Sequence, residues 1–449
     1  MHNEAIQTFK AKKILFVIDS LYTSNNGTSV SAQRYAAELR RRGHIVRALC
    51  GDKPKTEQDK SITDGDYCTG IFRFPVFQFL CEKHDFYYAN ADANIIRRAC
   101  EWADIVHVFT PFFLGNAAIR CCELIPRPVT AAFHVQPENI TSSFGMGKVT
   151  PINSMIYSIF RHFTYSRVRH IHVPSQFIAD ELAQHAYTAR THVISNGIHD
   201  AFMQAGERKF RVKSLESGER GGSNVESSKS VFKIMMVGRL SKEKRQDVII
   251  NAVKQSRYAD RIQVVFAGRG PEHDKYVELG KDLKHQPQFI YVGRDELIEN
   301  LLDTDLYIHA SDMESEAISC IEAFATGLVP VIADSKVSAT PQFALDKRSL
   351  FRAGDPQDLA RAIDYWLDHP EEKARMEQRY AEAARQYTLR RLVERFEQML
   401  AEEIATHTQK APIASKQTKL SNDKSKPIDH TTRPVRHSTG KSRHRRRVA

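Results

Sequence analysis

Two acidic residues, Glu314 and Glu322, stand with seven residues between them in DLYIHASDMESEAISCIEAFATGLVPVIAD, residues 305–334. The pattern predicts a strand, a short polar loop, a helix that begins near Ala317 and ends at Gly327, and another strand. The unpaired N–H groups of a helix start can hold a phosphate, and a carboxylate nearby can accept hydrogen bonds from sugar hydroxyls. This arrangement predicts a site for a phosphorylated sugar compound. A solvated position on the helix is the alternative for Glu322.

The elements around these residues predict an α/β protein. Short apolar runs alternate with helical patterns, as in parallel sheets covered by helices, and 449 residues exceed a single core. Ligands of such sheets lie beyond the carboxyl ends of the strands, so two facing sheets would hold a ligand between them. The expected strands are 13–19, 45–50, 105–109, 129–134, 170–174 and 192–195 in one half, and 232–238, 262–267, 289–292, 305–309 and 329–333 in the other.

The domain boundaries follow from changes in composition along the chain. We expect a first domain over residues 1–200, a linker or loop over 201–230 and a second domain over 231–388. The linker is predicted because Gly, Ser, Lys and Glu replace apolar residues from Gly206 to Ser230. Residues 389–405 predict an amphipathic helix that packs back on the first domain, and residues 406–449 a disordered tail.

The residues around the two glutamates resemble the nucleotide-sugar glycosyltransferases of family 4. The hallmark of that family is E-x7-E, a small-residue helix end and P-V-I, and this chain has Glu314, Glu322, Gly327 and 330–332 in register. The resemblance implies the fold called GT-B, with two facing Rossmann-like, doubly wound parallel-sheet domains, here followed by the basic tail. It also implies a glycosyltransferase that moves a hexose with retention of anomeric configuration.

The resemblance extends to VGRLSKEKRQDVIINA, residues 237–252, where the family uses an Arg and a Lys to hold the donor diphosphate. By position these are Arg239 and Lys244. Fixed cations stabilise the charge that builds on a departing diphosphate, so no metal and no other cofactor is expected. Ordinary surface charge is the alternative for both. The D-x-D spacing of 64–66 is interpreted as a chance occurrence in a loop.

Two residues of the first half match positions that the family places near the donor. Gly27 opens the first predicted helix, where the family brings its backbone close to phosphate and acceptor, and a plain turn is the alternative. His134 closes the run VTAAFH, where the family often has a histidine that faces the donor sugar. A buried structural histidine is the alternative, but the carboxyl end of a strand favours function.

The resemblance thus implies two sets of site residues. Those implied in catalysis are His134, Glu314, Arg239 and Lys244, and those implied in donor binding are Gly27, Gly238, Arg239, Lys244, Glu314, Ala317, Ile318 and Glu322. Many relatives read E-G-F-G after the first glutamate, whereas this chain has Glu314-Ser315-Glu316-Ala317. Ala317 can bring its amide to the ligand if its φ stays negative, and Glu316 adds a charge without an assigned role.

The identities of the donor and of the acceptor are separate expectations, each with alternatives. We expect a UDP-sugar ahead of a GDP-sugar as donor, and a lipid such as diacylglycerol or another membrane-linked molecule as acceptor. A soluble glycan or small molecule is the alternative acceptor. Two further readings remain within GT-B enzymes, a nucleotide-sugar epimerase and a phosphorylase. A catalytically silent scaffold whose tail binds nucleic acid or anionic membrane is the alternative of another class.

Charge and hydropathy set the expected surroundings of the protein. Residues 406–449 hold twelve Lys and Arg against two Asp, which is +10 of the net charge of +11. The globular part is therefore nearly neutral, which argues against a nucleic-acid groove there. With the tail, the predicted helix over 155–169, basic and amphipathic, could contact an anionic membrane, although packing on its own sheet is the alternative. No run of apolar residues suits a signal peptide or span, so we expect a cytoplasmic protein, peripheral at the membrane face.

Overall fold

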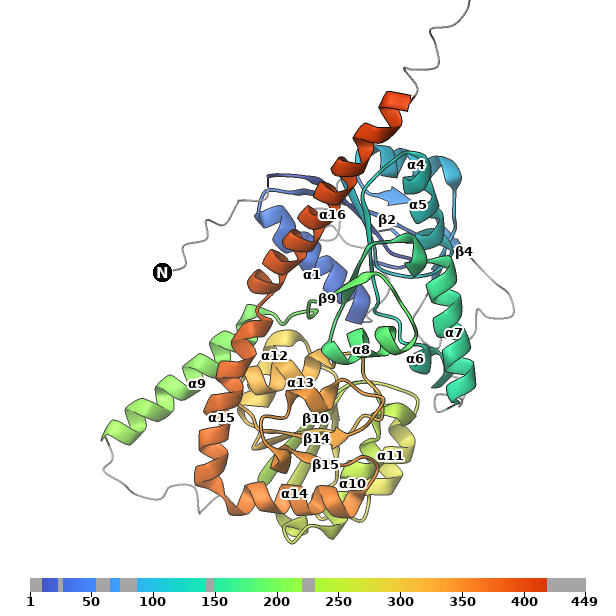
Figure 1. Ribbon diagram of the computed structural model, residues 1–449. Helices are drawn as coiled ribbons and strands as arrows, with labels where there is room; N and C mark the ends of the chain where they lie inside the picture. The colour runs from blue at the N-terminus through green and yellow to red at the C-terminus, as the bar shows by residue number, and fades with distance from the viewer. Residues whose placement is uncertain are drawn as a thin grey trace, which may run out of the picture. The chain divides into compact units, whose positions relative to one another are not determined.

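A computed structural model describes residues 10–22, 27–53, 65–72, 87–142, 149–219 and 231–417, with the backbone alone for 142, 213–219 and 410–417. Residues 1–405 form one compact unit, and 406–449 a second. The first unit holds two parallel sheets, each covered by helices (Figure 1), so the predicted α/β architecture is confirmed. The prediction of a disordered tail over 406–449 is partly wrong, because helix α16, Leu389–Gln417, continues past residue 406. Residues 418–449 lie outside the described residues.

The first sheet has seven strands in the order β3-β2-β1-β6-β7-β8-β9, and all their pairings are parallel. A separate antiparallel pair consists of β4 (Ile71–Phe72) and β5 (Tyr88–Ala89). The seven strands are β1 (Lys13–Val17), β2 (Ile45–Cys50), β3 (Tyr67–Cys68), β6 (Ile105–Val108), β7 (Val129–Ala132), β8 (His170–Val173) and β9 (Arg190–Val193).

Strand β1 divides its side chains between two layers of core. Ile14 and Phe16 join a cluster with α1 and α16, whereas Leu15 and Val17 join one with α4, α5, α7 and α8, as the alternation of a strand requires. The predicted last helix therefore packs on the first domain through Leu392, Phe396 and their neighbours. The helices are α1 (Gly27–Arg41), α4 (Ala93–Trp102), α5 (Phe113–Leu124), α6 (Pro137–Ser142), α7 (Thr150–Phe163) and α8 (Gln176–Gln184).

The second sheet has six strands in the order β12-β11-β10-β13-β14-β15, again all parallel. They are β10 (Phe232–Val237), β11 (Ile262–Ala267), β12 (Gln288–Ile290), β13 (Leu306–His309), β14 (Pro330–Asp334) and β15 (Leu350–Arg352). The covering helices are α9 (Asp200–Glu219), α10 (Gln246–Gln255), α11 (His273–Gly280), α12 (Arg294–Leu302), α13 (Ile318–Ala325), α14 (Pro356–Asp368) and α15 (Pro370–Ala384).

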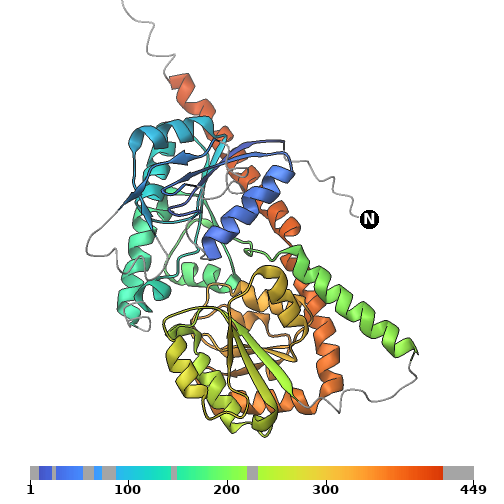
Figure 2. The same ribbon diagram turned by 180° about the vertical axis from the view of Figure 1, so that it is seen from behind.

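Part of the expected linker over 201–230 is helical, which corrects that prediction. Helix α9 extends to Glu219, and 220–230 lie outside the described residues. Phe202 and Met203 anchor α9 in the core of the second domain, and α9 lies beside α15 (Figure 2). Lys and Glu are good helix formers, so a composition poor in apolar residues did not exclude a helix that needs only one buried end.

Candidate functional site

The helix start that the two glutamates predicted is present, with one departure. Helix α13 begins at Ile318, and Ala317 before it has φ 70° and ψ 70°, the left-handed conformation. The condition set for Ala317, a negative φ, is therefore not met. The loop reaches the helix through a turn that glycine would adopt more easily, and α13 has no side-chain cap. Its first N–H groups lack a capping side chain, the condition that suits an anion.

Glu314 lies in a cluster of charged and polar side chains before α13. Lys244 donates to Glu314 Oε1 at 2.5 Å, and Nε2 of His309 lies 3.1 Å from the same oxygen. Burial alone would raise the pKa of Glu314, but the ammonium of Lys244 and the ring of His309 outweigh burial and hold that pKa well below its ordinary value. Glu314 is therefore ionised at neutral pH and tied to a cation.

The turn that carries Lys244 is fixed by the loop that carries Glu314. Asp312 donates its backbone N–H to the carbonyl of Glu243 at 2.8 Å, and Arg245, at φ 56°, donates to the Asp312 carboxylate at 3.3 Å. The two loops follow the adjacent strands β10 and β13. Neighbouring parallel strands thus bring Lys244 and Glu314 together although 69 residues separate them in the sequence.

Arg239 and Gly238 lie directly after β10. The carbonyl of Arg239 accepts from the Gln246 side chain at 2.8 Å, and Gly238 donates its N–H to the carbonyl of Ala267 at 2.9 Å. A side chain at Gly238 would meet only the stem of Lys244, whereas a Cβ at Gly268 would lie 2.0 Å from the Gly238 carbonyl oxygen. The glycine that this close approach demands is therefore Gly268, which was not among the predicted site residues.

Glu322 lies one turn into α13, against the first domain. It is buried, and its Oε1 is 3.5 Å from Nη2 of Arg34 in α1. Burial raises the pKa of Glu322 to about 7, and Arg34 opposes that rise in part. The carboxyl is thus a buried group rather than a solvated helix residue. Arg34 also donates to the carbonyl of Gly197 at 3.2 Å, where the chain passes between the domains.

Glu316, which had no assigned role, binds the connection between the domains. Its carboxylate accepts from the backbone N–H of Asn196 at 3.0 Å and from the Asn196 side chain at 2.6 Å. Burial raises the pKa of Glu316 to about 7, against the opposing hydrogen bonds from Ser195 and Asn196. The charge that departs from the family pattern therefore fastens the loop before α13 to the crossing chain.

In the first domain, His134 lies two residues past the end of β7 and is buried. Its ring stacks on Phe109 with centroids 5.9 Å apart, and among the described residues neither ring nitrogen has a hydrogen-bond partner. Burial and the neighbouring His172 hold its pKa well below the ordinary value, so the ring is neutral. A structural histidine would normally have a partner, so the orphaned nitrogens favour a ligand. Gly27 begins α1, and a Cβ there would meet nothing within 4 Å.

Two contributors escaped the sequence analysis. His309 ends β13, and a histidine at the carboxyl end of a strand is the signal that pointed to His134, so it was available. Arg34 gave no signal, because one arginine within SAQRYAAELRR looks like any exposed helix residue.

The D-x-D spacing of 64–66 is described at its last two residues. Asp66 accepts hydrogen bonds from the backbone N–H of Ala48 at 2.7 Å and from Tyr22, so its role is structural, and Asp64 lies outside the described residues.

The chain matches two family models. "Glycosyl transferases group 1" matches residues 223–386, and "Glycosyltransferase Family 4" matches residues 25–202. The chain is 26% identical over 70% of its length to alpha-monoglucosyldiacylglycerol synthase of Streptococcus pneumoniae, 69% of which is covered. It is 24% identical over 72% of its length to a GDP-mannose-dependent alpha-mannosyltransferase of Mycolicibacterium smegmatis, 79% of which is covered.

The fold is also found among solved structures. Anabaena HepE in complex with UDP and glucose superposes with a TM-score of 0.61 at 16% identity, over 87% of this chain and 100% of that one. Within the described residues, none of the helices combines the length and the apolar character that crossing a membrane requires.

Proposed function

Since this chain belongs to the group 1 glycosyltransferases of family 4, we propose that it moves a hexose, with retention, from a nucleotide diphosphate sugar to a hydroxyl of a membrane lipid. The observation that carries this proposal is the cluster of Lys244, Glu314 and His309 beside the uncapped start of α13. Cation, ionised carboxylate and helix N–H groups are the set that a sugar diphosphate needs.

In this proposal the diphosphate binds between Lys244, Arg239 and the start of α13. An ammonium has three N–H donors. Lys244 donates one of them to Glu314, so two can bind phosphate oxygens. Glu314 accepts hydrogen bonds from hydroxyls of the donor sugar. Glu322 accepts from the ribose, with Arg34 beside it favouring the ionised form. His134 contributes a neutral ring nitrogen to the sugar.

The proposed reaction breaks the bond between the anomeric carbon and the diphosphate oxygen. The acceptor oxygen bonds to that carbon on the same face, and its proton passes to the departing diphosphate. Negative charge builds on the diphosphate as the bond breaks, and Lys244, Arg239 and α13 stabilise it. We propose that these groups accelerate the reaction by stabilising this charge, without a metal or other cofactor at the diphosphate.

For the donor we propose a UDP-sugar, with a GDP-sugar as the alternative that the mannosyltransferase relative favours. The test is the shift in unfolding temperature with UDP, GDP and ADP. A ligand at about 100 times its dissociation constant stabilises by about 2.7 kcal/mol. One nucleotide should stabilise the wild type, while Arg239→Ala and Glu322→Ala should lose the shift. The exposed Glu296→Ala should keep it as the control. If none of the three stabilises the protein, the silent-scaffold reading replaces this proposal.

For the acceptor we propose a lipid, supported by a stripe on α7. Met155, Ile159 and Phe163 recur every four residues with 56%, 44% and 47% of their surface exposed, whereas Tyr157 and Phe160 of the same helix are buried. The helix thus packs on its own domain by one face and leaves a second apolar face exposed. The alternative prediction for 155–169, packing on its own sheet, therefore describes one face, and the exposed face remains for the proposed membrane contact. An exposed apolar stripe along a helix suits the surface of a membrane.

The test of the acceptor has two arms. Co-sedimentation with vesicles should increase with anionic lipid for the wild type and fall for Met155→Ser/Ile159→Ser/Phe163→Ser, but not for Val277→Ser, a 45%-exposed apolar residue of the second domain. Transfer of labelled sugar should then be assayed on diacylglycerol and on a sterol, each a lipid with a single hydroxyl, and on soluble glycans. Turnover on the glycans alone would contradict the lipid acceptor while leaving the glycosyltransferase intact.

A further inference from the structure

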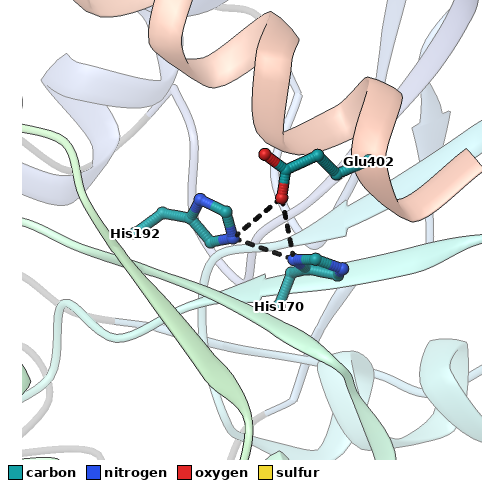
Figure 3. A group of neighbouring side chains, drawn as sticks. All are labelled: His170, His192 and Glu402. Carbon is teal, nitrogen blue, oxygen red and sulfur yellow. Dashed lines mark hydrogen bonds and ion pairs between the residues drawn. The ribbon is translucent and has the colours of Figure 1, made fainter. Parts of the chain in front are cut away.

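Two histidines and a glutamate gather away from the proposed reaction site. His170 is the first residue of β8, His192 lies in the adjacent edge strand β9, and Glu402 lies on α16, which covers this face of the sheet (Figure 3). His134, in contrast, follows the carboxyl end of β7. His170 therefore lies at the amino end of its strand, and His192 is the third of the four residues of β9, whereas ligands of such sheets bind beyond the carboxyl ends.

The three side chains turn one ligand atom each toward a common point. Nδ1 of His170 and Nε2 of His192 are 2.8 Å apart, and Oε2 of Glu402 is 3.9 Å and 4.0 Å from them. In a tetrahedral site with metal–ligand distances near 2.1 Å, the ligand atoms lie roughly 3.4 Å from one another. The observed separations bracket that value, so small side-chain rotations would bring the three atoms to a metal.

The surroundings prepare His170 as a ligand. Its other nitrogen, Nε2, lies 3.7 Å from Oε2 of the buried Glu403, which also accepts from Arg169, so a small movement would let this carboxylate accept the Nε2 proton and leave Nδ1 for the metal. A carboxylate behind a histidine is the usual second layer of a metal site. The Glu402 side chain is 40% exposed although its Oε2 atom is buried, so a water that supplies a fourth ligand must enter past the exposed edge of this side chain.

We propose that His170, His192 and Glu402 form a structural site for a divalent transition metal, with Zn²⁺ as the natural occupant. Two imidazoles and one carboxylate are a ligand set that Zn²⁺ accepts. The metal would fasten α16 to β8 and β9 and would take no part in sugar transfer. It would replace the hydrogen bond between the two histidines.

One competitor is already in place. Nη1 of Arg190 lies 2.9 Å from Oε2 of Glu402, and its side chain is 67% exposed. A metal must displace this guanidinium, and the displacement loses only the small free energy of an exposed ion pair. Arg190→Gln should therefore tighten metal binding by roughly two- to fivefold. A purely structural ion pair predicts no such gain.

The test uses the full chain without a histidine tag, after dialysis against chelator. Co²⁺ should bind at one per chain with the visible absorption of four-coordinate cobalt, and Zn²⁺ should displace it and raise the unfolding temperature. His192→Gln and Glu402→Gln should each weaken Co²⁺ binding at least ~10-fold.

His44→Gln is the matched control. His44 contacts Glu397 of the same helix at 2.9 Å, but no second histidine joins that pair in the metal-capable groups of the described residues, so the variant should keep the site. The proposal is overturned if the wild type binds no Co²⁺, or if it binds Co²⁺ but both His192→Gln and Glu402→Gln bind as much. The first outcome would leave a metal-free hydrogen bond between the two histidines.

Discussion

Glu314 and Glu322 lie on either side of the start of α13, and their surroundings shift their pKa values in opposite directions. Glu314 contacts Lys244 and His309, which outweigh its burial and keep it ionised. Glu322 contacts the more distant Arg34, and burial raises its pKa to about 7. The same residue type therefore serves as a fixed anion at one end of the motif and as a carboxyl that titrates near neutral pH at the other.

The largest expected effect comes from removing the cation on Glu314. Lys244→Ala should lower kcat/KM for the nucleotide sugar by about 10²–10³-fold, the usual loss for one group that stabilises developing charge. It should also weaken the nucleotide-induced rise in unfolding temperature. Lys284→Ala, an exposed lysine of the same domain, should change neither. Wild-type turnover in Lys244→Ala would remove Lys244 from the mechanism.

The second prediction concerns the burial of Glu322. A carboxyl whose folded pKa is raised holds its proton longer in the folded state, so its contribution to stability falls as pH rises from its ordinary value of 4.5 to about 7. Glu322→Gln removes this fall. Relative to the wild type, the variant should gain about 1–3 kcal/mol in unfolding free energy between pH 4.5 and pH 7.5. Denaturant titrations at several pH values measure the difference, and a constant difference would contradict the raised pKa.

The third prediction sharpens the role of Arg34. Arg34→Met removes the charge that opposes the rise in the pKa of Glu322. The pH-dependent loss of stability, which begins near the ordinary pKa of 4.5, should then extend to higher pH, and nucleotide affinity at pH 7 should fall by about tenfold, or about 1.4 kcal/mol. Arg98→Met, at an exposed position of α4, is the control. If Arg34→Met leaves the pH dependence unchanged, the ion pair between Arg34 and Glu322 does not lower the pKa of Glu322.

The smallest expected effect is at Ala317, between the two glutamates. Its φ of 70° is strained for alanine, so Ala317→Gly should stabilise the protein by about 0.5–1 kcal/mol once the entropy of the unfolded glycine is subtracted. Ala186→Gly, at φ 57° outside the site, should gain a similar amount. Ala383→Gly in α15 should lose about 1 kcal/mol because it weakens a helix. A loss at Ala317→Gly would mean that the alanine methyl contributes packing that outweighs its strain.

Much of the fold followed from local patterns. The eleven expected strands are all present in the expected order, with ends that differ by a few residues. The strands that escaped prediction, β3, β4, β5 and β15, have two or three residues each, too few for a pattern. The helical part of the expected linker escaped because only its first turns are buried.

The sequence by itself determined the motif around Glu314, because a strand, a loop, a helix start and a strand are contiguous in the chain. It also supplied Lys244 and Arg239 through a motif after one strand. What only the tertiary structure decided are the partnerships between distant segments, such as Lys244 with Glu314, Arg34 with Glu322 and Glu316 with Asn196. Burial and neighbouring charge set the pKa of a carboxyl, and both arise only when separate strands and helices pack together.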